Sequence, residues 1–247
     1  MKTALITGAT SGIGKSTAIL FAKKGYNLIL CGRREERLNV LKQTLKTNIH
    51  TLTFDVRDKD AVFSAINSIP EEFKNIDILL NNAGNAHGMS KIQDGNIDDW
   101  DAMMDGNVKG LLYVTKAVLP TMIANNSGFI VNIGSVAAKE VYPNGNVYCA
   151  SKHAVDALSK SMRIDLAGHN IRVSAIHPGA VETEFSEVRF KGDKEKADTV
   201  YQGFDALQAQ DIAEIIEFVT SRPSHVNIED LVVYPTAQAN TTTLVKN

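Results

Sequence analysis

Tyr148 and Lys152 stand four positions apart in the run Tyr148-Cys149-Ala150-Ser151-Lys152, which puts both side chains on one face of a helix, one turn apart. A free tyrosine phenol has a pKa of about 10 and transfers protons poorly at neutral pH. An ammonium about 4 Å away, at an effective dielectric constant of about 20, stabilises the phenolate by about 4 kcal/mol. We therefore expect a proton-transferring phenol whose pKa lies near neutrality, although the same spacing also occurs on ordinary amphipathic helices.

A glycine-rich turn and a serine support the catalytic interpretation. The turn reads Thr7-Gly8-Ala9-Thr10-Ser11-Gly12-Ile13-Gly14 and stands between a strand-like and a helical run. Glycines in this context let the backbone approach a pyrophosphate at the helix N-terminus. Ser135 precedes Tyr148 by thirteen positions and follows an apolar, strand-like run. We interpret the turn as a dinucleotide-binding loop, with a purely structural turn as the alternative.

Arg33 and Arg34, directly after the second strand-like run, indicate which dinucleotide binds. An enzyme specific for NAD normally has an acidic residue here for the ribose hydroxyls. Arginine can instead bind the 2′-phosphate of NADP through two parallel hydrogen bonds. A solvated basic helix start is the alternative, but arginine at a helix N-terminus opposes the helix dipole. The sequence therefore predicts NADP.

The composition is that of an ordinary single-domain enzyme. The chain has 247 residues, of which 44% are hydrophobic, and a net charge of −2. It can bury a full core, and the charge gives no reason to expect nucleic acid or an anionic membrane as a partner. No apolar run approaches the roughly 20 residues that span a bilayer, and the first residues form too short an apolar stretch for a signal peptide. We expect a cytoplasmic location.

The cysteines and histidines predict neither a disulfide framework nor a metal site. Cys31 and Cys149 are the only cysteines, which is typical of buried residues in a reducing compartment. The six histidines show no metal-ligand spacing, so no metal is expected.

Short apolar runs alternate with longer helical patterns along the chain. The strand-like runs are Thr3–Ile6, Asn27–Leu30, His50–Phe54, Ile76–Leu80, Phe129–Ile133, Arg172–His177 and Leu231–Val233. The helical patterns are Ile13–Lys24, Glu35–Lys46, Lys59–Ile69, a long stretch from Asp98 to Asn125, Val147–Ala167 and Ala209–Thr220. This alternation predicts βαβ crossovers in a Rossmann-like, doubly wound parallel sheet of about seven strands, an α/β fold in a single domain over residues 1–247. Residues 178–208 are the one long segment without clear periodicity, and their length suggests a substrate lid.

Taken in order, these motifs resemble the short-chain dehydrogenase/reductase family over essentially the whole chain. Further motifs in the series are Asp55-Val56, Asn81-Asn82-Ala83-Gly84, Asn107 and Pro178-Gly179. The resemblance implies a catalytic tetrad of Asn107, Ser135, Tyr148 and Lys152. It implies cofactor contacts from the turn, from Tyr148 and Lys152, and from Asp55, Val56, Asn82, Ala83, Gly84, Pro178, Gly179, Val181 and Thr183. It also implies a homotetramer built partly on the long helices.

The implied roles agree with the chemistry of these side chains. Hydride would pass between the nicotinamide and the substrate carbinol carbon, so the protein has to orient the substrate and move one proton. Ser135 would hold the substrate oxygen, and Tyr148 would take or give the proton. Lys152 would, by resemblance, also bind the nicotinamide ribose. Asn107 would hold a water that links Lys152 to solvent, with a simple helix kink as the alternative.

The last third of the chain bears on the substrate. Residues 182–193 and 234–239 are similar to the NADP-dependent 3-hydroxy acid dehydrogenases, which act on substrates such as serine, L-allo-threonine or 3-hydroxypropionate. A 3-hydroxy acid needs a cation at its carboxylate, and the planar guanidinium of Arg189 suits this better than the flexible ammonium of Lys191. A surface loop with scattered charges is the alternative. The physiological substrate, its stereochemistry and the direction of the reaction stay open.

Two other functions remain possible on this fold. A non-catalytic NADP sensor would be expected to lose part of the tetrad, and all four residues are present. A reductase of 3-oxoacyl groups on an acyl carrier protein would need a basic docking surface, of which the net charge of −2 gives no sign.

Overall fold

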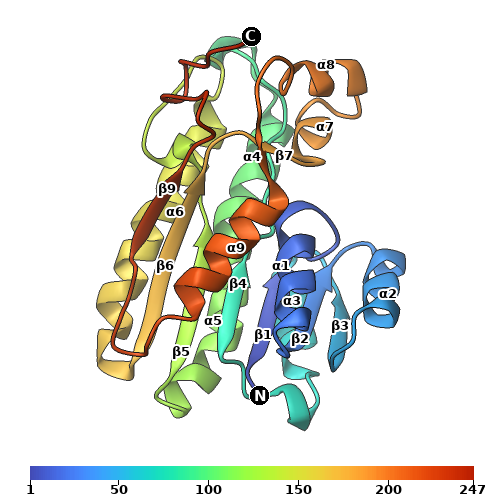
Figure 1. Ribbon diagram of the computed structural model, residues 1–247, viewed down its shortest axis with the longest axis vertical. Helices are drawn as coiled ribbons and strands as arrows, with labels where there is room; N and C mark the ends of the chain where they lie inside the picture. The colour runs from blue at the N-terminus through green and yellow to red at the C-terminus, as the bar shows by residue number, and fades with distance from the viewer.

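The computed structural model describes residues 1–247, and a single seven-stranded sheet forms its centre (Figure 1). Every neighbouring pair of strands is parallel, in the order β3-β2-β1-β4-β5-β6-β9. The strands are β1 (Thr3–Thr7), β2 (Asn27–Gly32), β3 (Ile49–Thr53), β4 (Ile78–Asn81), β5 (Gly128–Ile133), β6 (Ile171–Pro178) and β9 (Asp230–Val233). The predicted Rossmann-like fold of about seven strands is confirmed.

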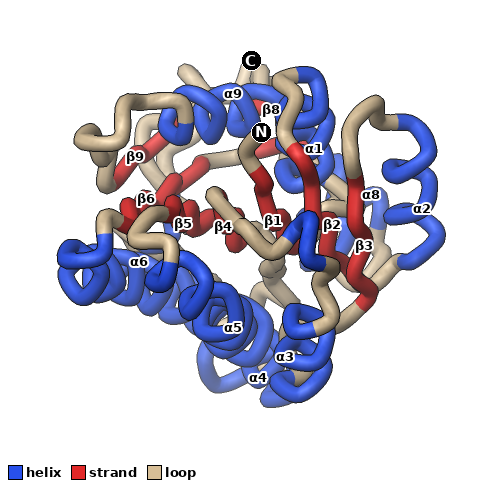
Figure 2. Tube along the Cα trace, turned by 90° about the horizontal axis from the view of Figure 1, so that it is seen from below, coloured by secondary structure: helices blue, strands red, loops and turns tan.

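Helices cover both faces of the sheet (Figure 2). On one face α1 (Gly12–Lys23) packs against α9 (Ala209–Thr220), and α2 (Glu35–Thr44) lies beside the edge strand β3. The other face carries α3 (Lys59–Asn67), α5 (Gly110–Ala124) and α6 (Asn146–Leu166). None of these helices combines the length and the apolar character needed to cross a membrane.

Successive residues of the central strands enter two separate cores, because side chains alternate across a sheet. Ile6, Leu30 and Leu80 pack beneath α1 and α9, whereas Leu5 and its neighbours on the adjacent strands pack beneath α3 and α5. All of these side chains are fully buried. Burial on both faces explains the unbroken apolar runs and brings the carboxyl ends of the strands to one edge of the sheet.

The long helix predicted between Asp98 and Asn125 is interrupted. α4 (Ile97–Met104) is followed by a π turn at Asp105–Lys109, and α5 then begins at Gly110. Single π turns inside helices occur frequently at functional sites. Here the turn buries Asn107.

Residues 178–208 are more regular than predicted. They contain the short parallel pair β7 (Val181–Glu182) and β8 (Leu207–Gln208), and the helices α7 (Phe185–Arg189) and α8 (Lys194–Thr199). Helices this short cannot display a helical period in the sequence. The two helices lie at the end of the molecule where the strands finish, at the top of Figure 1.

Candidate active site

A cavity of about 540 Å³ opens at the carboxyl ends of the strands. Its walls come from the glycine-rich turn, the loops after the next strands, α6 and residues 178–208. The predicted site residues that line it are Gly8, Thr10, Ser11, Gly12, Ile13, Arg33, Arg34, Asp55, Val56, Asn82, Ala83, Gly84, Ser135, Tyr148, Lys152, Pro178, Gly179, Val181, Thr183 and Arg189. Of the predicted residues, Gly14 and Asn107 lie outside this lining.

The turn after β1 is fixed by side chains from the loop after β4. Gly8 has a φ of +65°, and a Cβ there would lie 2.8 Å from Asn82 Nδ2, so only glycine fits. Asn82 Nδ2 donates to the carbonyl oxygens of Thr7 and Gly8 at 2.9 and 3.2 Å. α1 has no side-chain cap and no acidic residue in its first turn. Its N-terminus is therefore suited to bind an anion.

Arg34 reaches the glycine-rich turn. Its guanidinium donates to Thr10 Oγ1 and to Ser11 Oγ, each at 2.9 Å. It also forms a 2.9 Å ion pair with the carboxylate of Glu184, which is bound by Arg37 at 2.6 Å as well. Two hydroxyls and a guanidinium thus gather where an anionic group can bind, and the carboxylate of Glu184 is the anion that the guanidinium contacts in this structure.

Arg33 lies beside the predicted adenine-binding residues. Its Nη1 is 3.6 Å from the carboxylate of Asp55. Asp55 also accepts two hydrogen bonds from Arg57 Nε, at 3.1 and 3.0 Å, and Val56 lines the cavity next to it. The two arginines therefore face different parts of the cavity.

Tyr148 and Lys152 lie on the first turns of α6, and both are buried. Lys152 Nζ donates to the carbonyl oxygen of Ile133 at 2.9 Å and lies 5.9 Å from the centre of the Tyr148 ring. Burial lowers the pKa of Lys152 to about 8. The predicted arrangement of the pair on one helix face is present.

The expectation of a Tyr148 pKa near neutrality is wrong for this structure. Burial raises the pKa of Tyr148, and the neighbouring Tyr142 adds to the rise. Arg189 and the Ser135 side chain oppose the rise. Lys152 does not, because its ammonium is directed at the carbonyl oxygen of Ile133. Tyr148 is therefore held in its protonated form.

Asn107 lies behind the cavity wall rather than in it. Its Nδ2 donates to the carbonyl oxygen of Asn85 at 2.8 Å and to Ser151 Oγ at 3.0 Å, and its Oδ1 accepts from the Asn85 N–H at 2.8 Å. A Cβ on Gly84 would lie 2.9 Å from Asn107 Oδ1 and 3.7 Å from Lys152 Nζ. Asn107 is thus close to Lys152, and its water-holding role stays a prediction.

Arg189, the last residue of α7, reaches the Tyr148 end of the cavity. Its guanidinium carbon lies 4.9 Å from the centre of the Tyr148 ring and 5.1 Å from that of Phe185. One guanidinium nitrogen donates to the Tyr142 hydroxyl at 2.8 Å. Arg189 Nε is buried and has no hydrogen-bond partner. The guanidinium therefore retains a donor for a further acceptor.

Lys191 and two aromatic residues complete this end of the site. Lys191, the other cation considered for the carboxylate, pairs with Asp99 at 2.9 Å and does not line the cavity. Tyr142 and Phe185 do line it, and sequence reasoning missed both. Nothing in their spacing marks them, since they meet Tyr148 only through folding of the loop before α6 and of α7.

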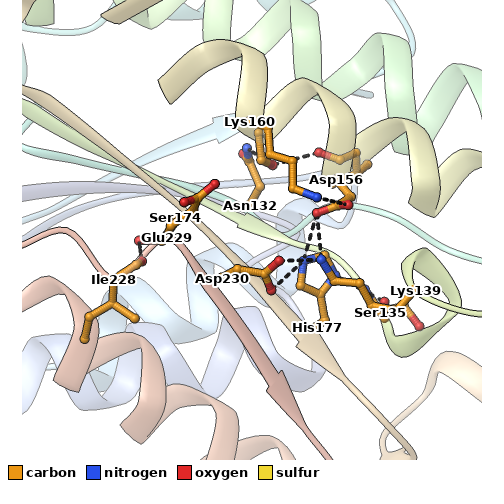
Figure 3. Close-up of polar contacts among 12 residues, drawn as sticks. Asn132, Ser135, Lys139, Asp156, Lys160, Ser174, His177, Ile228, Glu229 and Asp230 are labelled. Carbon is orange, nitrogen blue, oxygen red and sulfur yellow. Dashed lines mark hydrogen bonds and ion pairs between the residues drawn. The ribbon is translucent and has the colours of Figure 1, made fainter. Parts of the chain in front are cut away.

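A charged cluster around a buried imidazole, the His177 cluster, lies behind Ser135 (Figure 3) and comprises Lys139, Asp156, His177 and Asp230. The Lys139 ammonium contacts both carboxylates, with 2.9 Å to Asp156. His177 Nε2 lies 3.5 Å from a carboxylate oxygen of each aspartate. The histidine and the two aspartates are residues of metal-ligating type with ligand atoms within 4.8 Å of one another, but here Lys139 supplies the cation. Their separation in the sequence hid this cluster.

Comparisons with known proteins agree with these features. A family model described as short chain dehydrogenase matches residues 2–194. Sulfoacetaldehyde reductase 2 of Chromohalobacter salexigens is 48% identical over 238 residues, covering 95% of this chain and 94% of the relative. An NADP-dependent 3-hydroxy acid dehydrogenase of Escherichia coli (strain K12) is 46% identical over 236 residues, covering 95% of each chain.

A solved structure is similar over nearly the whole length. The closed form of serine dehydrogenase complexed with NADP⁺ superimposes with a TM-score of 0.94 at 44% identity, covering 99% of both chains. These matches confirm the resemblance carried by the sequence motifs, and the chain belongs to the short-chain dehydrogenase family.

Proposed function

We propose that this protein is an NADP-dependent oxidoreductase that interconverts the hydroxyl group of a small 3-hydroxy acid and the corresponding carbonyl. The observation that carries the proposal is the position of Arg189, whose guanidinium carbon lies 4.9 Å from the Tyr148 ring in the same cavity. A short acid whose carboxylate is bound by Arg189 would place its hydroxyl at Tyr148. The anion-binding group and the proton-transfer group of the proposal thus line the same cavity.

NADP is the cofactor. The similar proteins include a dehydrogenase named as NADP-dependent and a serine dehydrogenase solved with NADP⁺. The residues of this chain fit that group, because Arg34 with the hydroxyls of Thr10 and Ser11 forms a site for a phosphate, next to the uncapped N-terminus of α1. When bound, NADP supplies or accepts the hydride.

The chain's own residues handle the proton and the substrate oxygen. Burial keeps Tyr148 protonated, which suits a group that donates a proton to the carbonyl oxygen during reduction. Ser135, which lines the same cavity, would hold the same oxygen. Oxidation uses the same two groups, with Tyr148 accepting the proton.

Residues 178–208 form the lid in this proposal. Among the contacts that join the segment to the rest of the site are Glu184 to Arg34 at 2.9 Å, Lys191 to Asp99 at 2.9 Å, and the Gly88 N–H to the Arg189 carbonyl oxygen at 2.9 Å. The same segment carries Arg189, so a lid that opens would also remove the cation from the substrate. Binding of the acid would therefore favour the closed arrangement.

A sulfonate substrate is the second candidate. It is favoured by the 48% identity to a sulfoacetaldehyde reductase, and a sulfonate offers the guanidinium the same kind of acceptor oxygens as a carboxylate. The two are separated by assaying serine, L-allo-threonine and 3-hydroxypropionate with NADP⁺, and 3-oxo acids and sulfoacetaldehyde with NADPH, by NADPH absorbance. A kcat/KM for the carboxylic acids below that for sulfoacetaldehyde would favour the sulfonate.

Arg189→Ala tests the proposed anchor of the substrate anion. We expect kcat/KM for the preferred acid to fall, because a charge-assisted hydrogen bond is lost. The fall should correspond to about 1.5–3 kcal/mol of transition-state binding. The methyl ester of the same acid should be affected little. Lys194→Ala, which removes an exposed cation at the start of α8, is the matched control and should leave the kinetics of both substrates unchanged. Equal losses on acid and ester would mean that Arg189 only supports the lid.

A further inference from the structure

His177 lies directly against the backbone that carries Ser135. Its ring is completely buried at the end of β6, with Nδ1 3.4 Å from the Ser135 backbone nitrogen and 3.2 Å from the Ser135 carbonyl oxygen. A Cβ on Gly134 would lie 2.3 Å from Nδ1. The chain between β5 and Ser135 is thus packed so closely on the imidazole that no side chain fits between them.

The other side of the ring sets its tautomer. Nε2 faces one carboxylate oxygen from Asp156 and one from Asp230, each at 3.5 Å (Figure 3). Ionised carboxylates only accept hydrogen bonds, so a lone pair on Nε2 would meet two negative charges, and Nε2 therefore carries the proton. In this tautomer Nδ1 accepts from the Ser135 N–H at 3.4 Å, and the Ser135 carbonyl oxygen at 3.2 Å receives no proton from it.

The cluster has the charge balance to keep this tautomer. Lys139 places one ammonium between the two carboxylates. Burial and the Lys139 charge lower the pKa of His177, against the opposing effects of Asp230, Asp156 and the Ser135 backbone. The ring is therefore neutral at neutral pH, with one donor toward the carboxylates and one acceptor toward Ser135.

We infer that His177 is a positioning residue for Ser135, oriented by the carboxylates of Asp156 and Asp230. Asp156 lies on α6 one turn after Lys152, so the same ring also connects the serine to the helix that carries Tyr148. His177 thus fixes the position of the Ser135 hydroxyl relative to the Tyr148 phenol. This inference rests on the proposed catalytic role of Ser135.

Two substitutions distinguish the roles of the two ring nitrogens. In His177→Asn the side-chain amide keeps a polar atom near the position of Nδ1, whereas in His177→Gln it keeps one near Nε2. We expect His177→Asn to retain kcat within about threefold. His177→Gln should lower kcat by about 10²-fold, the loss that a displacement of about 1 Å produces. The dissociation constant of NADP, which does not contact His177 in this proposal, should stay unchanged in both.

The result that overturns the inference is an equal kcat in the two variants, or a weakened binding of NADP that accounts for the loss. A direct measurement on the wild-type protein needs neither substrate nor a stable Gln variant. Long-range ¹H–¹⁵N correlation on ¹⁵N-histidine-labelled protein reports the tautomer, and the His177 signal is the one missing in His177→Asn. An Nε2–H tautomer supports the inference and an Nδ1–H tautomer overturns it, whether or not a hydroxy acid proves to be the substrate.

Discussion

In the proposed mechanism proton transfer depends on the phenol of Tyr148, and Tyr148→Phe removes its hydroxyl while keeping the ring against Phe185 and Arg189. We expect turnover to fall by about 10²–10⁴-fold, which is what general acid–base catalysis supplies. The dissociation constant of NADP should change little. Tyr113→Phe, the same change on α5 away from the cavity, serves as the control. Near-normal turnover of the Tyr148 variant would rule out the phenol as proton donor.

Lys152 makes the stability of the cofactor-free protein depend on pH. Burial lowers its pKa from 10.5 to about 8, so between these two values the unfolded chain binds more protons than the folded one. Stability must then rise with pH through this range, by up to about 3 kcal/mol, and its contribution is lowest below about pH 8. Lys152→Met should abolish the rise. Urea unfolding of both proteins at about pH 7 and pH 10 measures it, and parallel changes in the two would contradict the buried ammonium.

The sequence predicted which groups meet but not their ionisation. The spacing of Tyr148 and Lys152 placed them on one helix face, and the structure agrees. Their pKa values depend on burial, which comes from Tyr142, Phe185 and other residues distant in the chain. Because no local pattern records that burial, the predicted direction for Tyr148 was wrong.

We predict that the loops after β1 and β2 distinguish NADP from NAD. Replacing Arg33 and Arg34 together by alanine should weaken the binding of NADP by about 3 kcal/mol or more and change the binding of NAD little, because only NADP carries the 2′-phosphate. Binding titrations with both dinucleotides measure the difference. Equal losses would show that the arginines support the loop instead of binding the phosphate.

Glu184→Gln is the matched control for that loop. Its carboxylate pairs with Arg34 and Arg37 while about two-fifths exposed, at 41%, and an exposed pair of this kind contributes about 0.2–1 kcal/mol. Releasing Arg34 should strengthen NADP binding by up to about fivefold. The change is therefore opposite in sign to that of the double arginine variant.

Elements with a long period or a long apolar run could be predicted, and short or irregular ones could not. The strands and the helices of ten residues or more were found because each repeats its pattern over several turns or positions. The π turn at Asp105–Lys109 leaves the polar and apolar spacing almost helical, so it was included in one long helix. α8 could have been found from Asp193, whose carboxylate caps it by accepting from the Lys196 N–H.

The His177 cluster shows the limit most clearly. Its members follow or belong to β5, α6, β6 and β9, and only the order of strands in the sheet brings β9 next to β6. The sequence predicted seven strands and a parallel sheet without assigning that order. The residues behind Ser135 could therefore not be predicted from their spacing in the sequence.

At the scale of the whole molecule, the two-sided burial of the sheet made the fold the most secure prediction, and the assembly remains to be tested. We propose a homotetramer formed partly through the long helices, which expose Leu112 and Ile123 on α5, each 37%, and Ile164 on α6, 71%. Ile164→Glu should lower the molar mass measured by light scattering. Val40→Glu, on α2, is the control and should not change it. A monomeric wild-type protein would contradict the proposal.

The π turn between α4 and α5 also fixes the rotation of α5 about its axis relative to α4. Each residue turns an α-helix by about 100°, so deleting one residue from Asp105–Lys109 would restore regular α-helix and rotate α5 by that amount against α4. Either Asn107 would turn away from Asn85, or the buried face of α5 with Val114 and Val118 would turn toward water. The contact of Asn107 with Asn85 and the buried face of α5 therefore both require the additional residue of the π turn.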